Sequence, residues 1–184
     1  MISVTFALSA MAQDKVAGTK FLSPDNSYQV QIIHPNDSEY FYGILVLKKG
    51  GSPILRVSTM GYITDAYWSP DGKYVAINNR NAESGDYVWV LSLVDGVIVK
   101  KPNDNLPEDN TPEKYPEYDS YEVHGQWILA RGWNKTGELN IEMDTYYTNV
   151  NDSLCDSLTY RVKNGKLILV HHTVVKKPRG IAQP

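Results

Sequence analysis

The stretch that decides the fold is Trp68-Ser69-Pro70-Asp71-Gly72-Lys73, which has the composition of a tight turn between two strands. A proline at the second position of a type I turn has its φ angle preset, and an aspartate tolerates the third position. The glycine that follows accepts a positive φ, which the chain often needs to return into the next strand. The stretch therefore predicts a strand–turn–strand unit.

The same pattern occurs 46 residues earlier as Ser23-Pro24-Asp25-Asn26-Ser27-Tyr28. Asn26 stands where the other copy has Gly72, and asparagine is the residue that tolerates a left-handed backbone best after glycine. We therefore expect one backbone geometry to be used twice, with both residues in the left-handed region.

Each copy lies within a unit that has four strand-like segments. The two units span residues 20–57 and 63–101, and a four-stranded unit that recurs every 40 to 50 residues is typical of a propeller blade. The strands that we expect are 20–22, 27–34, 42–48 and 54–57 in the first unit, and 63–68, 73–79, 87–93 and 97–101 in the second.

The two units resemble the blade repeats of TolB-type β-propellers, whose hallmark is W-S-P-D-G-K-x-hydrophobic-A. Residues 68–76 match this pattern closely and residues 22–30 match it more loosely, so the resemblance covers about half of the chain, residues 20–101. The resemblance implies that the motif residues are structural, and that partners bind at the channel mouth or on loops.

The second half of the chain departs from the repeat. Residues 102–119 form an acidic, proline-rich connection, and residues 120–175 are a degenerate β region. Within that region residues 126–130 are interpreted as the core of a third blade without the turn, and Asn164-Gly165 is a favoured hairpin pair. Three blades are fewer than the four to eight that close a ring. We therefore predict an all-β fold of antiparallel four-stranded blade-like repeats, propeller-like but open or incomplete.

Composition limits the function classes. The 184 residues fit a single domain, here 13–184, and the net charge of -3 gives no basic field for nucleic acid. No apolar run approaches the roughly 20 residues of a transmembrane segment. Residues 1–12 read as a signal peptide, truncated or only its tail, because they are apolar and end in small residues. Because large apolar residues alternate within this segment, a buried N-terminal strand is the alternative. We expect a periplasmic or secreted protein.

The weak catalytic candidates are Glu138, Glu142 and Asp144, which alternate onto one face of a strand. Carboxylate residues two apart on one strand have α-carbons roughly 6 to 7 Å apart, which is compatible with the acid and base of a glycosidase. The alternative is a solvated face paired across the sheet with Arg161 and Lys163.

Other chemistry has little support. The one cysteine, Cys155, excludes an internal disulfide, and its carboxylate neighbours would raise the pKa of the thiol. We expect it to be a small buried residue. His171 and His172 are adjacent on a strand and so point to opposite faces, one packed and the other solvated. We predict no metal and no cofactor.

Aromatic residues give the binding candidates. Tyr115, Tyr118 and Tyr121 lie along the acidic connection, and exposed tyrosines suit a protein or glycan partner. We expect the aromatic residues of the strands to pack in the core instead, namely Trp68, Tyr74, Trp89 and Trp127.

The first functional hypothesis is an exported, non-catalytic interaction module with a protein or glycan partner. The alternatives are a small polysaccharide hydrolase that uses the carboxylates of 138–144, and a structural fragment that is completed by oligomerisation.

Overall fold

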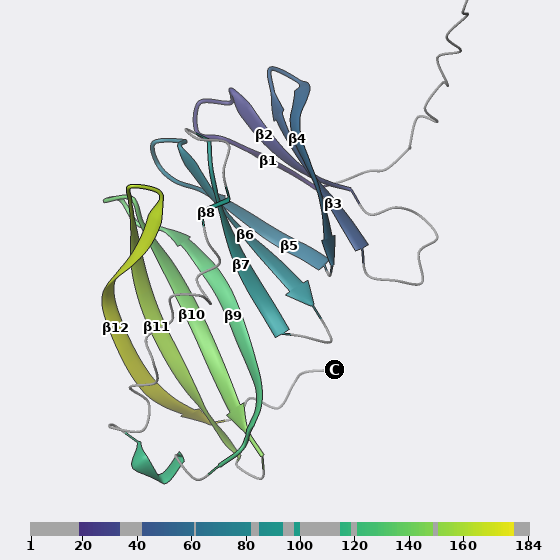
Figure 1. Cartoon of the computed structure of the whole chain (residues 1–184). Helices are drawn as coiled ribbons and strands as arrows, with labels where there is room; N and C mark the ends of the chain where they lie inside the picture. The colour runs from purple at the N-terminus through teal and green to yellow at the C-terminus, as the bar shows by residue number, and fades with distance from the viewer. Residues whose placement is uncertain are drawn as a thin grey trace, which may run out of the picture.

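Three antiparallel four-stranded sheets make up the described part of the chain in a computed structural model (Figure 1). The structure describes residues 19–33, 42–60, 62–81, 85–93, 98–99, 115–118, 121–148 and 151–178. The expected signal peptide and most of the acidic connection lie outside these residues.

The strands of each sheet are neighbours in chain order. The first sheet consists of β1 (Lys20–Leu22), β2 (Tyr28–Ile33), β3 (Tyr42–Lys49) and β4 (Ser52–Met60). The second, or middle, sheet consists of β5 (Tyr62–Trp68), β6 (Tyr74–Asn81), β7 (Gly85–Ser92) and β8 (Ile98–Val99). The third sheet consists of β9 (Val123–Trp133), β10 (Glu138–Tyr147), β11 (Asp152–Lys163) and β12 (Lys166–Pro178). A short 3₁₀ helix, η2, covers Pro116–Tyr118. The predicted fold class is confirmed: the chain is all-β, with blade-like sheets in an open, propeller-like arrangement.

The Ser-Pro-Asp turns have one geometry in both copies. Asn26 has a φ of 59° and Gly72 a φ of 69°, so both are left-handed as predicted. In the second copy Ser69 N donates to Tyr74 O at 2.9 Å, and Ser69 Oγ donates to Asp71 at 2.7 Å. The equivalent bonds of the first copy measure 2.9 and 2.6 Å. The turn is thus fixed by its own side chains.

A related turn, one residue shorter, joins β9 to β10 and was not predicted from the sequence. Asn134 N donates to Glu138 O at 2.9 Å, and Gly137, with a φ of 77°, donates its N–H to Asn134 O at 3.0 Å. Asn134 Oδ1 accepts from Thr136 N at 3.0 Å. The third sheet thus lacks the Ser-Pro-Asp turn, as the sequence indicates, but has a turn at the same place that an asparagine side chain closes.

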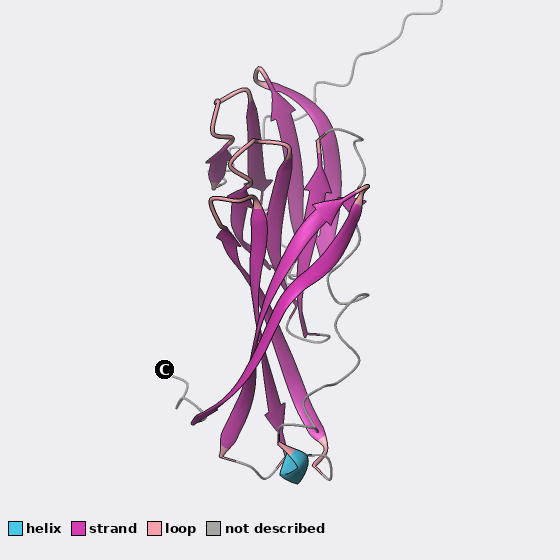
Figure 2. Cartoon of the chain, turned by 90° about the vertical axis from the view of Figure 1, so that its left-hand side faces the viewer, coloured by secondary structure: helices cyan, strands magenta, loops and turns pink. Residues whose placement is uncertain are grey.

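Two apolar cores hold the three sheets together, one at each interface (Figures 1 and 2). One indole ties each pair of sheets: Trp68 Nε1 donates to Phe21 O at 3.3 Å, and Trp133 Nε1 donates to Tyr67 O at 2.9 Å. Because the two tryptophans end β5 and β9, they stand at equivalent places in successive sheets.

A buried asparagine adds a second tie between the middle and third sheets. Asn78 Nδ2 donates to Ala130 O at 3.1 Å, and Ala130 N donates to Asn78 Oδ1 at 2.8 Å. Asn78 thus satisfies both backbone groups of a residue on another sheet, which an apolar side chain would leave unpaired.

The third sheet has the longest strands, of 10 to 13 residues, and extends beyond the middle sheet (Figure 2). A small third core packs against the inner face of this extension, formed by Tyr118, Tyr147, Leu154 and Val174. The described residues contain no helix with the length and apolarity needed to cross a membrane.

Candidate functional site

The outer face of the third sheet, which faces away from the middle sheet, holds the predicted carboxylates. Along β10 every second residue is buried, and Glu138, Glu142 and Asp144 alternate with these core residues as half-buried groups. One row across the four strands consists of Trp127, Asp144, Cys155 and Val175.

Glu142 is bound by two cations from other strands. Arg131 Nε donates to its carboxylate at 2.7 Å and Lys177 Nζ at 2.6 Å. Lys177 is the largest cause that lowers the pKa of Glu142 to about 2, and hydrogen bonds from Cys155 and Arg131 lower it further. Glu142 therefore stays ionised at neutral pH. Sequence spacing gave no signal for these partners, because they come from β9 and β12.

Glu138 is held in a second ion pair at the turn end of β10. Its carboxylate accepts from Arg161, the residue opposite it on β11, and from Asn134 Nδ2 at 3.0 Å. The Asn134 hydrogen bond is the largest cause that lowers the pKa of Glu138, followed by the bond from Arg161. The cross-strand pairing of Glu138 with Arg161 is the solvated-face alternative weighed from the sequence.

Cys155 lies in the middle of the outer face yet is only 1% exposed. Its thiol donates to Glu142 at 3.2 Å. Burial raises the pKa of Cys155 to about 12, and hydrogen bonds to Asp144 and Glu142 act in the same direction. The thiol is therefore protonated at neutral pH and is a poor nucleophile. The expectation of a buried cysteine is confirmed.

A metal ion would find oxygen and sulfur atoms here, because donor atoms of Glu142, Asp144 and Cys155 lie within 4.8 Å of one another. The cations of the chain itself already contact the cluster, since Lys177 and Arg131 both bind Glu142. The arrangement is that of an ion cluster neutralised by protein side chains.

Trp127 differs from the core role expected for it. Its side chain is 41% exposed on the outer face, next to Tyr146, with ring centroids 6.5 Å apart and planes at 88°. The sequence pattern predicted the strand correctly but assigned Trp127 to the wrong face of it. Ile128 and Ala130 point into the core, so Trp127 points outward. A large aromatic ring is thus exposed beside the ion cluster.

The three tyrosines of the acidic connection meet at the far end of the third sheet. Tyr118 contacts Tyr115 and Tyr121 edge-on, with centroids 6.4 and 5.9 Å apart. Tyr118 is only 3% exposed and packs on Tyr147, so its ring is part of the third core and is not a stacking surface. Tyr115 is half-buried, and Tyr121 is 44% exposed.

The two adjacent histidines divide as expected. His172 Nε2 lies 2.6 Å from Asp156 Oδ1 on the inner face, whereas His171 is exposed. The Asp156 side chain is almost fully buried, so this hydrogen bond belongs to the packing of the third sheet.

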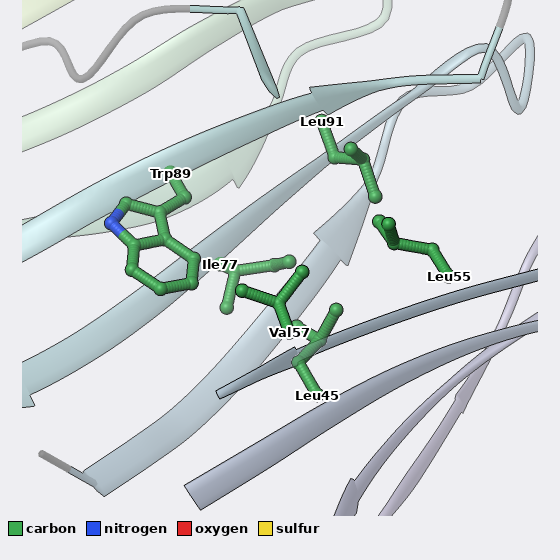
Figure 3. Close-up of a pocket in the computed structure, with 6 residues that line it drawn as sticks. All are labelled: Leu45, Leu55, Val57, Ile77, Trp89 and Leu91. Carbon is green, nitrogen blue, oxygen red and sulfur yellow. The ribbon is translucent and has the colours of Figure 1, made fainter. Parts of the chain in front are cut away.

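A pocket lies between the first and middle sheets (Figure 3). It is open to solvent and, with that open space included, measures about 220 Å³; its lining side chains are Leu45, Leu55, Val57, Ile77, Trp89 and Leu91. With no polar group to orient a ligand, it has the character of a packing gap between splayed sheets.

Comparison with known proteins gives structural likenesses of low identity. No family model matches the chain, and no curated protein matches it. Among solved structures it is similar to the WD40 domain of SCAP from fission yeast, with 12% identity, a TM-score of 0.40, and coverage of 89% of this chain and 33% of that one. It is similar to the periplasmic gluconolactonase PpgL of Pseudomonas aeruginosa, with 13% identity, a TM-score of 0.38, and coverage of 88% and 58%. It is also similar to the hydrazine synthase of Kuenenia stuttgartiensis, with 11% identity, a TM-score of 0.38, and coverage of 93% and 53%. The chain thus spans only about a third to three fifths of the length of these chains.

Proposed function

We propose that the chain is an exported, non-catalytic interaction module that binds a protein or glycan partner at the extended end of its third sheet. The observation that carries the proposal is the exposed Trp127, on a face where the Glu142 carboxylate is already paired with Arg131 and Lys177. Tryptophan, tyrosine and arginine are the residues that dominate binding energy at interfaces, and Trp127, Tyr146 and Arg131 share this face.

The lowered pKa values of the carboxylates argue against the hydrolase. A glycosidase needs one carboxylic acid with a raised pKa, whereas the pKa values of Glu138 and Glu142 are both lowered. Among the described residues, the only thiol is buried and protonated. Glu142 is thus better suited to a structural ion pair than to acid–base work.

The composition of the end sheets argues against a fragment that needs a partner to close its stack. At several outer positions the end sheets are polar where the middle sheet is apolar. These are Gln29 and Gln31 in the first sheet, and Asn140, Ser157 and Thr159 in the third. Terminal repeats with polar outer faces are the usual way in which a repeat array ends. A strict monomer in light scattering would agree with this, and a stable oligomer would support the fragment.

Export and the TolB-type relationship of the blades are part of the proposal and rest on the sequence. The apolar residues 1–12 and the W-S-P-D-G-K stretch support them. Expression of the full chain in a bacterium, followed by cell fractionation and intact mass, tests export. A periplasmic product that begins near Gln13 is expected, and an unprocessed cytosolic product would contradict it.

The interaction itself is tested with the immobilised full chain, exposed to envelope extract and to a glycan array. We expect a partner that is retained by the wild type and by Ile168→Ala, and lost with Trp127→Ala. Ile168 is the matched control because it is 44% exposed on the same outer face but on the other edge strand, β12. A wild-type chain that retains nothing from either source would contradict the proposed function.

A further inference from the structure

Four neighbouring positions on the outer face of the third sheet form one group, where β9 pairs with β10. Trp127 lies directly opposite Asp144, and Gly125 lies directly opposite Tyr146. Positions that are opposite each other, or two apart on one strand, lie within about 7 Å on the same face of a sheet. We call these four residues the corner site.

Two sides of the corner site are aromatic. The rings of Trp127 and Tyr146 have planes at 88° and centroids 6.5 Å apart, and Trp127 is 41% exposed. A cation is attracted to the face of an aromatic ring when it lies within about 6 Å of the centroid, and indole is the best such ring. At this separation of the centroids, one cation can lie within that range of both rings.

The glycine of the corner site leaves space beside the rings. Gly125 has no side chain, and nothing lies within 4 Å of the place where a β-carbon would be built on it. Its partner across the ladder is Tyr146, and Trp127 is two residues away on the same face. An incoming group can therefore approach the outer face at Gly125 without meeting a side chain there.

Asp144 gives the corner site its negative charge. The cations of the neighbouring ion cluster, Arg131 and Lys177, both bind Glu142. Asp144 itself forms no ion pair with the residues that the structure describes, and its Oδ1 is buried without a hydrogen-bond partner. Because solvent screens a buried charge less than an exposed one, Asp144 favours a cation beside it.

Hydrogen bonding indicates which kind of cation fits. The buried Oδ1 of Asp144 is shielded from the solvent side, so an incoming donor does not reach it. A primary ammonium is strongly hydrated and brings three protons that need acceptors. A quaternary ammonium donates no hydrogen bond, and aromatic walls are the usual way in which proteins bind it.

From the perpendicular rings, the glycine and the carboxylate without an ion pair, we infer that the corner site binds a quaternary ammonium ion with a trimethylammonium group, as in choline. Its methyl groups contact Trp127 and Tyr146, and its charge is balanced by Asp144. This ligand is additional to the protein or glycan partner of the proposed function, although both use Trp127.

The first test is an NMR titration of choline chloride with the full chain, which follows the methyl protons of choline. We expect saturable binding, with two control compounds bound about tenfold more weakly. One is the neutral isostere of choline in which carbon replaces nitrogen, so that shape is kept without charge. The other is ethanolamine, which keeps the charge without the methyl groups. Equal binding of choline and either control would overturn the inference.

A pair of charge variants tests the carboxylate. Asp144→Asn keeps the shape of the side chain and should weaken choline binding about fivefold, because it removes the balancing charge. Glu138→Gln is the matched control, since Glu138 lies on the same face of β10 but is already paired with Arg161. It should leave choline binding unchanged. Equal weakening in both variants, with unchanged melting temperatures, would overturn the assignment to Asp144.

A pair of leucine variants tests the space. Gly125→Leu fills the approach to the rings and should weaken choline binding about tenfold. The φ of Gly125 lies outside the left-handed region, so the backbone tolerates a side chain. Ser157→Leu is the control, because Ser157 is exposed on the same outer face but lies on β11. Choline binding that survives Gly125→Leu would place the ligand elsewhere and overturn the corner site.

Two further measurements identify the source of the group and separate the inference from the proposed function. Cosedimentation with phosphatidylcholine vesicles, reversed by free choline, would identify a lipid headgroup as the source, and choline binding without cosedimentation a soluble cation. A wild-type chain that retains a partner from envelope extract but does not bind choline would end this inference and leave the proposed function standing. Choline binding without any retained partner would do the reverse.

Discussion

The middle sheet and the two end sheets share related turns and one strand order, but differ in what their faces carry. The middle sheet is apolar on both faces of β6, with Val75 and Ile77 toward the first sheet and Ala76 toward the third. At the positions equivalent to Val75 and Ile77, the first sheet has Gln29 and Gln31.

The third sheet shows the same exchange on its outer face. Where the middle sheet buries Ala76, Val88 and Val90 against its neighbour, the equivalent positions are Asn140, Ser157 and Thr159. The repeated backbone therefore does not decide whether a face packs against another sheet; the side chains on that face do. Polar side chains at these outer positions resemble those of the terminal repeats of an array.

The largest predicted effect comes from placing a polar side chain where the middle sheet packs against its neighbour. Val90→Asn puts an amide into the interface between the middle and third sheets, and should lower the free energy of unfolding by about 4 kcal/mol, from lost apolar burial and an unpaired polar group. Thr159→Asn, at the equivalent outer position, should change it by at most about 0.5 kcal/mol. Urea denaturation of both variants measures the difference, and equal effects would break the comparison.

The second prediction concerns the one polar tie inside an apolar interface. Asn78→Ala leaves the N–H and C=O of Ala130 unpaired in the core, and should cost about 2 kcal/mol. The control, Asn140→Ala, removes an amide from the outer face, where water replaces its bonds. A loss of stability as large at Asn140 as at Asn78 would mean that the outer face is not solvated. The measurement is again the denaturation midpoint.

The third prediction is a pH dependence that arises from Glu142 on the outer face of the third sheet. Hydrogen bonding by Lys177, above all, lowers the pKa of Glu142 from 4.5 to about 2, so this ion pair stabilises the fold above pH 4.5 and loses its contribution as the pH falls toward 2. Because the two cations are partly exposed, the contribution should be about 1 kcal/mol. Glu142→Gln should therefore cost this amount at pH 6 and progressively less toward pH 2. A cost that does not depend on pH would contradict the assignment.

The smallest effect on stability compares the two interfaces of the middle sheet. The interface with the first sheet contains the apolar pocket. Val57→Ile adds a methylene group to that pocket and should stabilise the fold by about 0.5 kcal/mol. Val123→Ile, on an exposed edge, is the control and should change little. A destabilised Val57→Ile variant in thermal denaturation would show that the gap is already filled.

The sequence was most informative where structure depends on the neighbouring residues. Ser69-Pro70-Asp71-Gly72 contains all the groups that close its turn, so the turn and the strands beside it were predictable. The third turn was missed because Asn134 satisfies the same backbone groups with different chemistry.

The candidate site was less predictable because its contacts are not local. Alternation placed Glu138, Glu142 and Asp144 on one face correctly, but it cannot say that Lys177, 35 residues further along, would bind Glu142. Alternation likewise does not say which face is the core, and Trp127 was assigned to the wrong one for that reason.

The two indoles that tie successive sheets give the molecule a built-in optical readout. Trp68 sits at the first interface and Trp133 at the second, each with its N–H bonded to a carbonyl of the preceding sheet. The emission of an indole shifts to longer wavelength when it gains water. A chain whose only tryptophan is Trp68 or Trp133 would therefore report, by the wavelength of its emission, the separation of that pair of sheets.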